Sequence, residues 1–246
     1  MPSLRIITWN CRSGSISTRL SQLAAYSPHV VFLQECDPGK TLRPTGQTCS
    51  RRINRMKGIA LVAPSSGYRC AGLRPRTAAG RATIAAAVTG RVSFTALGIW
   101  AQGADYVGDV LRTLAAHAGL LRRGPSVVMG DFNSGTKLAD KRSLNRGHQQ
   151  IVDELTTLGL VSAYHAFHRL EHGQETHPTY FHQFNPSRPW HIDFCFVPEP
   201  WAPRLVNVRV LEGDEWKARS DHRALLVDIE TSSQAVRPDR PAPNAA

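Results

Sequence analysis

Acidic residues are absent from a long interval of this 246-residue chain, because no Asp or Glu lies between Asp37 and Asp105. The interval holds eleven basic residues, and the rest of the chain carries nineteen basic and nineteen acidic ones, so this segment accounts for the whole net charge of +11. A region of one sign attracts polyanions, which favours nucleic acid or another polyphosphorylated partner. A bias toward arginine codons is the alternative, but it leaves the missing acids unexplained. The basic residues are Lys40, Arg43, Arg51, Arg52, Arg55, Lys57, Arg69, Arg74, Arg76, Arg81 and Arg91.

Cysteine is scarce, and long apolar runs are missing. Five cysteines form an odd, scattered set without CxxC spacing, which argues against a disulfide framework and fits a reducing compartment. No stretch reaches the ~18 consecutive apolar residues of a membrane-spanning helix. The opening MPSLRIITWNC has neither the apolar region nor the cleavage site of a signal peptide. We therefore expect a cytoplasmic protein without a membrane partner.

Short apolar segments rich in β-branched residues alternate with turns and a few amphipathic stretches. The length and the 41% hydrophobic content predict one domain, which spans residues 1–230. Residues 231–246 are rich in Pro, Ser and Ala, which predicts a disordered tail. Helical spacing predicts helices over 15–26, 105–121 and 149–160. Many strands with few helices indicate an α+β fold, a two-layer β core with helices outside. The predicted strands are 4–10, 29–36, 58–64, 81–90, 92–102, 126–133, 179–183, 191–197, 205–211 and 224–229.

Polar side chains recur where these strands end or where apolar packing would be expected. A single such group has a simple explanation, since an Asp or Asn after a strand often forms an Asx turn or is a satisfied core polar group. Burying unpaired carboxylates is costly, however, so a repeated pattern calls for partners, metal ions or a water-lined cleft. The residues in question are Asn10, Glu35, Asp131, Asn133, Asp193, Asp221 and His222.

These residue types support a specific chemistry. Carboxylates at strand ends form a hard oxygen site for Mg²⁺ or Mn²⁺, which polarises a phosphoryl group and stabilises a leaving oxygen. His222 beside a buried Asp193 would be oriented by that carboxylate. A further carboxylate would activate water, with asparagines holding the phosphate or the nucleophile.

The ordered words TWNC, FLQE, GDFN, HIDF and SDH, spread over residues 8–222, resemble the endonuclease/exonuclease/phosphatase superfamily, which includes exonuclease-III-like nucleases, DNase I and sphingomyelinases. The resemblance implies a four-layer α/β sandwich, in which two packed, mostly antiparallel β-sheets are flanked by helices. It also implies metal-dependent hydrolysis of phosphodiesters or phosphomonoesters by direct in-line attack of water.

The resemblance assigns roles to the matching positions. Glu35 corresponds to the main Mg²⁺ ligand, with Asn10 and Asp221 near the metal. Asp131 corresponds to the residue that activates or orients water. The remaining catalytic positions are Asn133, as the partner of Asp131, and the pair Asp193 and His222, which contacts the scissile phosphate.

Some positions depart from the family pattern. Arg12 stands where some nucleases have an acid, and Trp100 and Gln102 stand where many members have a His or Tyr. We expect Arg12 and His191 to contact substrate phosphate, and Trp100 either to be a core residue or to contact the substrate by stacking on a base.

Two other features leave alternatives open. The spacing of His165, His168 and His172 is compatible with a zinc site on one helix face, although surface histidines are common and HExxH is absent. The basic loop 134–148 is either a phosphate-backbone contact or a solvated surface loop.

Together the residues predict a monomeric, Mg²⁺- or Mn²⁺-dependent phosphodiester hydrolase, a nuclease acting on DNA or RNA. A phosphatase or lipid phosphodiesterase with the same site is one alternative, because a fold does not fix a substrate. A catalytically inactive nucleic-acid-binding module is the other.

Overall fold

The computed structural model describes residues 3–39, 47–65, 67–74, 80, 82–138 and 147–231. The predicted tail beyond Thr231, the predicted basic contacts at 141, 142 and 146, and four basic residues of the acid-free interval lie outside the described residues. These four are Lys40, Arg43, Arg76 and Arg81.

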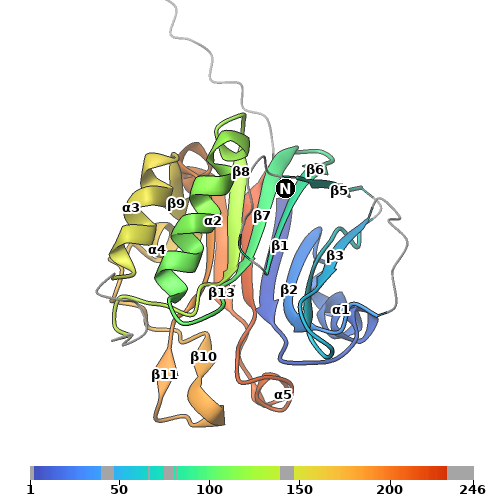
Figure 1. Ribbon diagram of the computed structural model, residues 1–246, viewed down its shortest axis with the longest axis vertical. Helices are drawn as coiled ribbons and strands as arrows, with labels where there is room; N and C mark the ends of the chain where they lie inside the picture. Colours follow the sequence, from blue (N-terminus) through green and yellow to red (C-terminus); the bar gives the residue numbers. More distant parts are fainter. Residues whose placement is uncertain are drawn as a thin grey trace, which may run out of the picture.

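Two six-stranded sheets form the centre of the molecule (Figure 1). The first has the order β13-β14-β1-β2-β4-β3, and the second has the order β5-β6-β7-β8-β12-β9. Each sheet contains one parallel pair, β1 with β2 and β7 with β8, and its other pairs are antiparallel. The first sheet consists of β1 (Ser3–Asn10), β2 (Val30–Cys36), β3 (Thr48–Arg52), β4 (Gly58–Val62), β13 (Leu205–Val210) and β14 (Leu225–Glu230). The second consists of β5 (Arg69–Leu73), β6 (Thr83–Thr89), β7 (Phe94–Trp100), β8 (Ser126–Asp131), β9 (Leu160–Ser162) and β12 (Asp193–Pro198).

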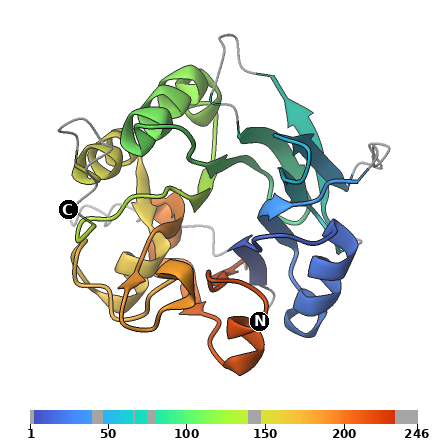
Figure 2. The ribbon, with the colours of Figure 1, turned by 60° about the horizontal axis from the view of Figure 1, so that its bottom comes forward.

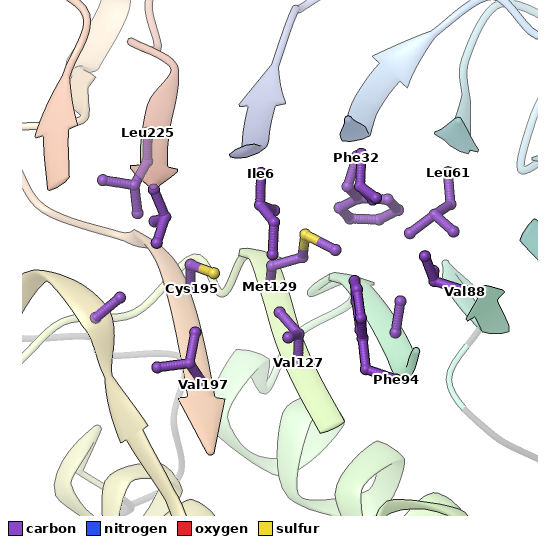
Figure 3. Packing of buried hydrophobic residues seen from close by; sticks show 14 of the residues in the cluster. Ile6, Phe32, Leu61, Val88, Phe94, Val127, Met129, Cys195, Val197 and Leu225 are labelled. Carbon is purple, nitrogen blue, oxygen red and sulfur yellow. The ribbon is translucent and has the colours of Figure 1, made fainter. Parts of the chain in front are cut away.

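The inner faces of the two sheets pack on each other. Figure 3 shows Ile6, Phe32 and Leu225 of one sheet facing Met129 and Cys195 of the other. Alternate residues of a strand point to opposite faces, so each of these strands places every second side chain in this layer. This alternation sets the direction of the polar residues that end the same strands.

Helices cover the outer faces and complete the four layers (Figure 2). The helix α1 covers the first sheet, where Ile16 and Leu23 join Trp9 and Trp216 in one cluster. The helices α2 and α3 cover the second sheet, where Leu114 packs in another cluster. Ser15 is the N-cap of α1, since its hydroxyl accepts the Thr18 N–H at 3.1 Å. The helices are α1 (Ile16–Leu23), α2 (Tyr106–Leu121), α3 (Gln149–Thr157), α4 (Ala163–His168) and α5 (Asp214–Lys217), and the shorter elements are β10 (Tyr180–Phe181), β11 (Pro189–Trp190) and the 3₁₀ turns Ala24–Tyr26, His182–Phe184 and Glu199–Arg204.

The predicted four-layer α+β sandwich is therefore confirmed. The strands β3 and β5 escaped the sequence pattern because β3 is largely exposed and polar and β5 pairs with β6 alone at the sheet edge. The predicted strand at 179–183 is only the two-residue β10, which pairs with β11 in a hairpin that projects from one end of the sandwich (Figure 1). In the described part of the chain, no helix combines the length and apolar character needed to cross a bilayer.

Candidate active site

Three strands deliver polar side chains to one end of the space between the sheets. In β1, Leu4 and Ile6 face the inner layer, and the alternation brings Asn10 to the same side. In β8 and β12, the same rule brings Asp131 and Asp193 inward, and these two residues are paired directly across the strands. The Asn10 amide donates to Asp131 Oδ2 at 2.9 Å, so the ends of the two sheets meet at this point.

Glu35 reaches the site through a β-bulge. Leu33 packs against the outer layer, so regular alternation would turn Glu35 the same way, away from the other carboxylates. The register instead shifts between Gln34 and Cys36, and Glu35 has a φ of 60°. Such bulges re-aim side chains next to active sites. As a result, Glu35 Oε1 lies 3.3 Å from the amide nitrogen of Asn10.

Gly130 allows the backbone to reach Asp131. Its φ of 139° lies in a region that favours glycine, and a Cβ at this position would lie 1.9 Å from the carbonyl oxygen of Ile99. The close approach of β7 and β8 therefore requires a glycine immediately before the carboxylate.

Asp131 is the centre of a hydrogen-bond network. It accepts the backbone N–H of Asn133 on Oδ1 at 2.9 Å and the Asn133 amide on Oδ2 at 3.3 Å, besides the Asn10 amide. Asn133 thus follows Asp131 in an Asx turn with a φ of 49°. The expected Asx turn and the expected cluster of polar side chains are therefore both present at Asp131. Burial raises the pKa of Asp131 to about 7, with Asp193 acting in the same direction and His222 against it.

His222 and Asp193 form a buried pair. His222 Nδ1 lies 2.9 Å from Asp193 Oδ2, and its Nε2 lies 3.9 Å from Asp131 Oδ2. Burial alone would lower the pKa of His222, but the Asp193 and Asp131 carboxylates outweigh it and raise that pKa to about 9. Among the described residues, Asp193 Oδ1 is buried and has no hydrogen-bond partner. The pair therefore holds an imidazolium whose Nε2 lies toward Asp131.

The backbone around this pair is held by hydroxyl groups. Thr179 Oγ1 accepts the N–H groups of Ile192 and Asp193 at 3.0 and 3.1 Å. Ser220 Oγ donates to the Asn10 carbonyl at 2.8 Å and accepts the His222 N–H at 3.0 Å. These contacts fix the strand end and the loop that carry the site.

Asp221 and Tyr180 lie on the rim of the site. The Asp221 carbonyl accepts the Phe181 N–H at 2.8 Å, and its half-buried carboxylate lies 3.5 Å from Ser220 Oγ. The Tyr180 ring lies 4.5 Å from the His222 ring. Burial raises the pKa of Tyr180 to about 12, and the charges of Asp221, Asp131 and Glu35 add to that shift. Tyr180 was not predicted from the sequence, and its only signal is its position in the segment leading to HIDF.

Lys57 is a second residue that sequence reasoning missed. Its ammonium group forms an ion pair with Glu35 Oε2, on the side opposite Asn10. Cys36 and Gly58 are paired in the register of β2 and β4, which brings the basic β3–β4 turn beside Glu35. The only signal in the sequence was that Lys57 belongs to the acid-free interval.

The donor set fits a hard divalent cation. Glu35 and Asp221 offer carboxylate oxygens and Asn10 offers an amide oxygen, which are the ligands that Mg²⁺ and Mn²⁺ prefer. Glu35 Oε2 is paired with the Lys57 ammonium group, so a bound ion would share this carboxylate with Lys57. Asp131, Asp193 and His222 form an adjoining group whose ligand atoms lie within 4.8 Å of one another.

The remaining predicted phosphate contacts are dispersed. Arg12 is exposed, and its guanidinium lies 4.6 Å from the ring centre of Phe184, in the segment that connects β10 and β11. Trp100 is 6% exposed and packs in the inner core, although it is paired in register with Asp131. His191 packs against Tyr164 at a ring distance of 4.6 Å, within a separate cluster of histidines. Substrate contact by these three residues stays a prediction.

Comparison with known proteins agrees with this fold. Residues 7–222 match the sequence profile of the Endonuclease/Exonuclease/phosphatase family. An AP endonuclease from Archaeoglobus fulgidus has a similar structure, with a TM-score of 0.70 and 17% identity over 92% of this chain and 99% of that one. A Neisseria 3′ phosphatase, NExo, bound to product DNA hairpin gives 0.64 and 22% over 92% and 99%. The catalytic domain of human nocturnin gives 0.60 and 18% over 93% of each chain.

No curated protein sequence matches the chain. At these identities the solved structures establish the fold, whereas the sequence profile spans most of the chain and includes every motif that carries the site. The chain therefore belongs to the endonuclease/exonuclease/phosphatase family.

Proposed function

We propose that this protein is a divalent-metal-dependent phosphodiesterase that hydrolyses nucleic acid. One observation carries the proposal. The buried Asp131 lies within 2.9 Å of the Asn10 amide and 3.9 Å of His222 Nε2, and Asn10 also contacts Glu35. A base, a cationic acid and a metal-ligating carboxylate are thus available to a single phosphate group.

In this proposal Asp131 accepts a proton from the attacking water. Its amide partners hold the carboxylate oxygens in place, and a pKa raised toward neutrality by burial suits a general base. Direct attack by water needs no nucleophilic side chain, so the free cysteines of this chain are not required.

His222 meets the phosphate as an imidazolium. Asp193 holds its Nδ1, so that Nε2 is free to contact a phosphate oxygen and stabilise the charge that develops on it. Asn133 and Asn10 position Asp131 relative to that oxygen.

A Mg²⁺ or Mn²⁺ ion would be held by Glu35, with Asn10 and Asp221 beside it. When bound, such an ion polarises the phosphoryl group and stabilises the leaving oxygen. Lys57 adds a further positive charge at the same carboxylate.

Several features support a nucleic-acid substrate. The exposed Arg55 lies in the same β3–β4 turn as Lys57, next to Glu35. Arg12 and Phe184 pair a cation with an exposed aromatic ring beside the site, a combination suited to a phosphate backbone and an unstacked base. The Neisseria phosphatase of similar fold is bound to a DNA hairpin. We further propose that the enzyme acts as a monomer.

The test is hydrolysis of labelled single-stranded, duplex and abasic DNA, with RNA and a generic phosphodiester in parallel, in Mg²⁺ and in Mn²⁺. Wild type is compared with Glu35→Gln and with Asp153→Asn, an exposed α3 substitution that serves as the control. We expect metal-dependent cleavage of nucleic acid by wild type and by the control, and its loss in Glu35→Gln. Cleavage of the generic ester alone would replace the nuclease assignment with a small-substrate phosphodiesterase. Salt-sensitive DNA binding without hydrolysis would identify an inactive binding module.

A further inference from the structure

A second polar cluster lies away from the proposed active-site residues, around α4 and the chain that follows it. It contains His165 and His172, and the acid Glu175, whose ligand atoms all lie within 4.8 Å of one another. The side chains of His165 and Glu175 are 6% and 7% exposed. The aromatic ring of Phe194, from the outer face of β12, packs near both histidine rings. The cluster thus consists of buried polar groups in apolar surroundings. Burying such groups costs free energy unless they are hydrogen-bonded or bind an ion.

The members of the cluster are already oriented toward one another. His165 Nε2 lies 3.1 Å from Glu175 Oε1, and Ser162 Oγ lies 2.7 Å from His165 Nδ1. Glu175 also accepts the Gly173 N–H at 2.9 Å. The rings of His165 and His172 stack with a centroid distance of 3.6 Å. A metal-ligating histidine usually has a hydrogen-bond partner on its other ring nitrogen, and Ser162 Oγ occupies that position on His165.

Three nitrogen atoms in this region lack a hydrogen-bond partner among the described residues. They are the buried Nε2 of His148, Nδ1 of His172 and Nε2 of His191. The residues His148 and His191 are only 4% and 7% exposed. Buried polar atoms are nearly always paired, so each such atom points to a missing partner such as an ion or water. The one on His172 belongs to a residue of the cluster itself, and the rings of His148 and His191 lie 5.9 Å from His172 and 6.1 Å from His165, respectively.

We propose that His165, His172 and Glu175 bind a Zn²⁺ ion. Two imidazoles with one carboxylate suit zinc rather than the hard cations expected at Glu35. A cavity of about 260 Å³ borders Glu175 and His191 and provides a path for the ion.

The ion would stabilise the segment that leads into the active site. Glu175 is followed closely by Thr179, whose hydroxyl holds the backbone of Asp193, and by Phe181, whose N–H binds the Asp221 carbonyl. Binding of a metal to the folded state alone raises stability. The proposed ion therefore has a structural role, in that it stabilises the segment that holds Asp193 of β12, and it does not contact the reacting phosphate.

The ligand set differs from the one suggested by helical spacing. His168 points elsewhere, because its Nε2–H donates to the Val208 carbonyl at 3.0 Å. His168 lies on the same helix as His165, and it is therefore a matched control for substitutions that affect α4 without affecting the metal.

The test is titration of the metal-free, full-length protein with Co²⁺, whose tetrahedral complexes absorb strongly in the visible, followed by displacement with Zn²⁺. The variants are His172→Asn, Glu175→Gln and Ser162→Ala, with His168→Asn and Glu35→Gln as controls. Unfolding curves are recorded for each variant to confirm a folded state.

We expect one tetrahedral Co²⁺ per chain in wild type and in both controls. His172→Asn and Glu175→Gln should weaken binding by at least about 100-fold, and Ser162→Ala by about 10- to 100-fold. The proposal is overturned if wild type gives no tetrahedral band, if the ligand variants bind as wild type does, or if His168→Asn or Glu35→Gln abolishes the band.

Discussion

Asp193 lies directly opposite Asp131 in the antiparallel pair of β12 and β8, so both carboxylates point to the same side of the sheet. The charge of Asp193 raises the pKa of Asp131, and the partners of the two carboxylates oppose that effect. Asp131 accepts from two asparagines, and Asp193 binds His222. The register of β8 with β12 thereby gives the two proposed roles to separate residues, Asp131 as the base and Asp193 as the residue that orients His222.

This separation predicts the effect of Asp193→Asn. The amide keeps the shape of the side chain but removes the charge that favours the imidazolium form of His222. We expect kcat to fall by about 10²- to 10⁴-fold, the usual contribution of a positioned acid or base, with little change in KM. Steady-state kinetics on the preferred substrate measures both constants. An unchanged kcat would remove the Asp193–His222 pair from the mechanism.

Lys57→Met should alter the metal requirement. The ammonium group shares Glu35 with any bound cation, so its removal reduces repulsion at that carboxylate. The pair is partly solvent-exposed, and such pairs contribute roughly 0.2–1 kcal/mol, so the half-saturating Mg²⁺ concentration should fall by only a few-fold. Activity as a function of Mg²⁺ concentration gives this value. A higher metal requirement would mean that Lys57 supports the metal site instead of competing with the ion.

Gly130→Ala should destabilise the fold severely. The added Cβ would collide with the Ile99 carbonyl, and the residue would keep an unfavourable positive φ. We expect the free energy of unfolding to fall by about 3 kcal/mol or more, as for other combinations of steric clash and backbone strain. Urea unfolding measures the change.

Gly119→Ala is the matched control for that substitution. Gly119 lies in α2, and a Cβ there would meet nothing within 4 Å. Alanine is favoured over glycine in a helix by about 0.5–1 kcal/mol, so this variant should be more stable than wild type. Equal effects of the two substitutions would contradict the close approach of β7 and β8.

The stability of the protein should depend on pH through His117. Burial lowers the pKa of this histidine below 6.5, with the Nδ1–H bond to the Thr113 carbonyl acting against that shift. His117 is therefore protonated less in the folded state than in the unfolded chain. As a result, the free energy of unfolding falls as the pH drops below about 6.5. His117→Gln should make this decline shallower between pH 6.5 and pH 5, while at pH 8 the same variant shows only its packing cost. A decline as steep as that of wild type would show that His117 does not contribute.

Much of the site was predictable because polar residues interrupted apolar strands. Asn10, Asp131 and Asp193 follow from strand alternation alone, and the fold follows from the order of strands and helices. Glu35 lies at the site only because a bulge reverses its direction, and no residue pattern announces that bulge.

Long-range contacts explain the rest. Lys57 reaches Glu35 through the pairing of β2 with β4, and Glu175 reaches His165 through an irregular loop. Neither pairing leaves a periodic signal, since the partners are separated by loops whose path depends on tertiary packing. The sequence therefore indicated the chemistry of the first site and only hinted at the second.

The most direct test of the proposed mechanism is the single-turnover rate of Mg²⁺-dependent cleavage by Asp131→Asn, measured beside wild type and Asp153→Asn on the preferred nucleic acid. The substitution keeps the hydrogen-bonding shape but removes the proton acceptor, so the rate of the chemical step should fall by at least about 10²-fold with substrate binding retained. Asp153→Asn should match wild type. A rate for Asp131→Asn close to that of wild type would contradict the assignment of Asp131 as the base and, with it, the proposed active site.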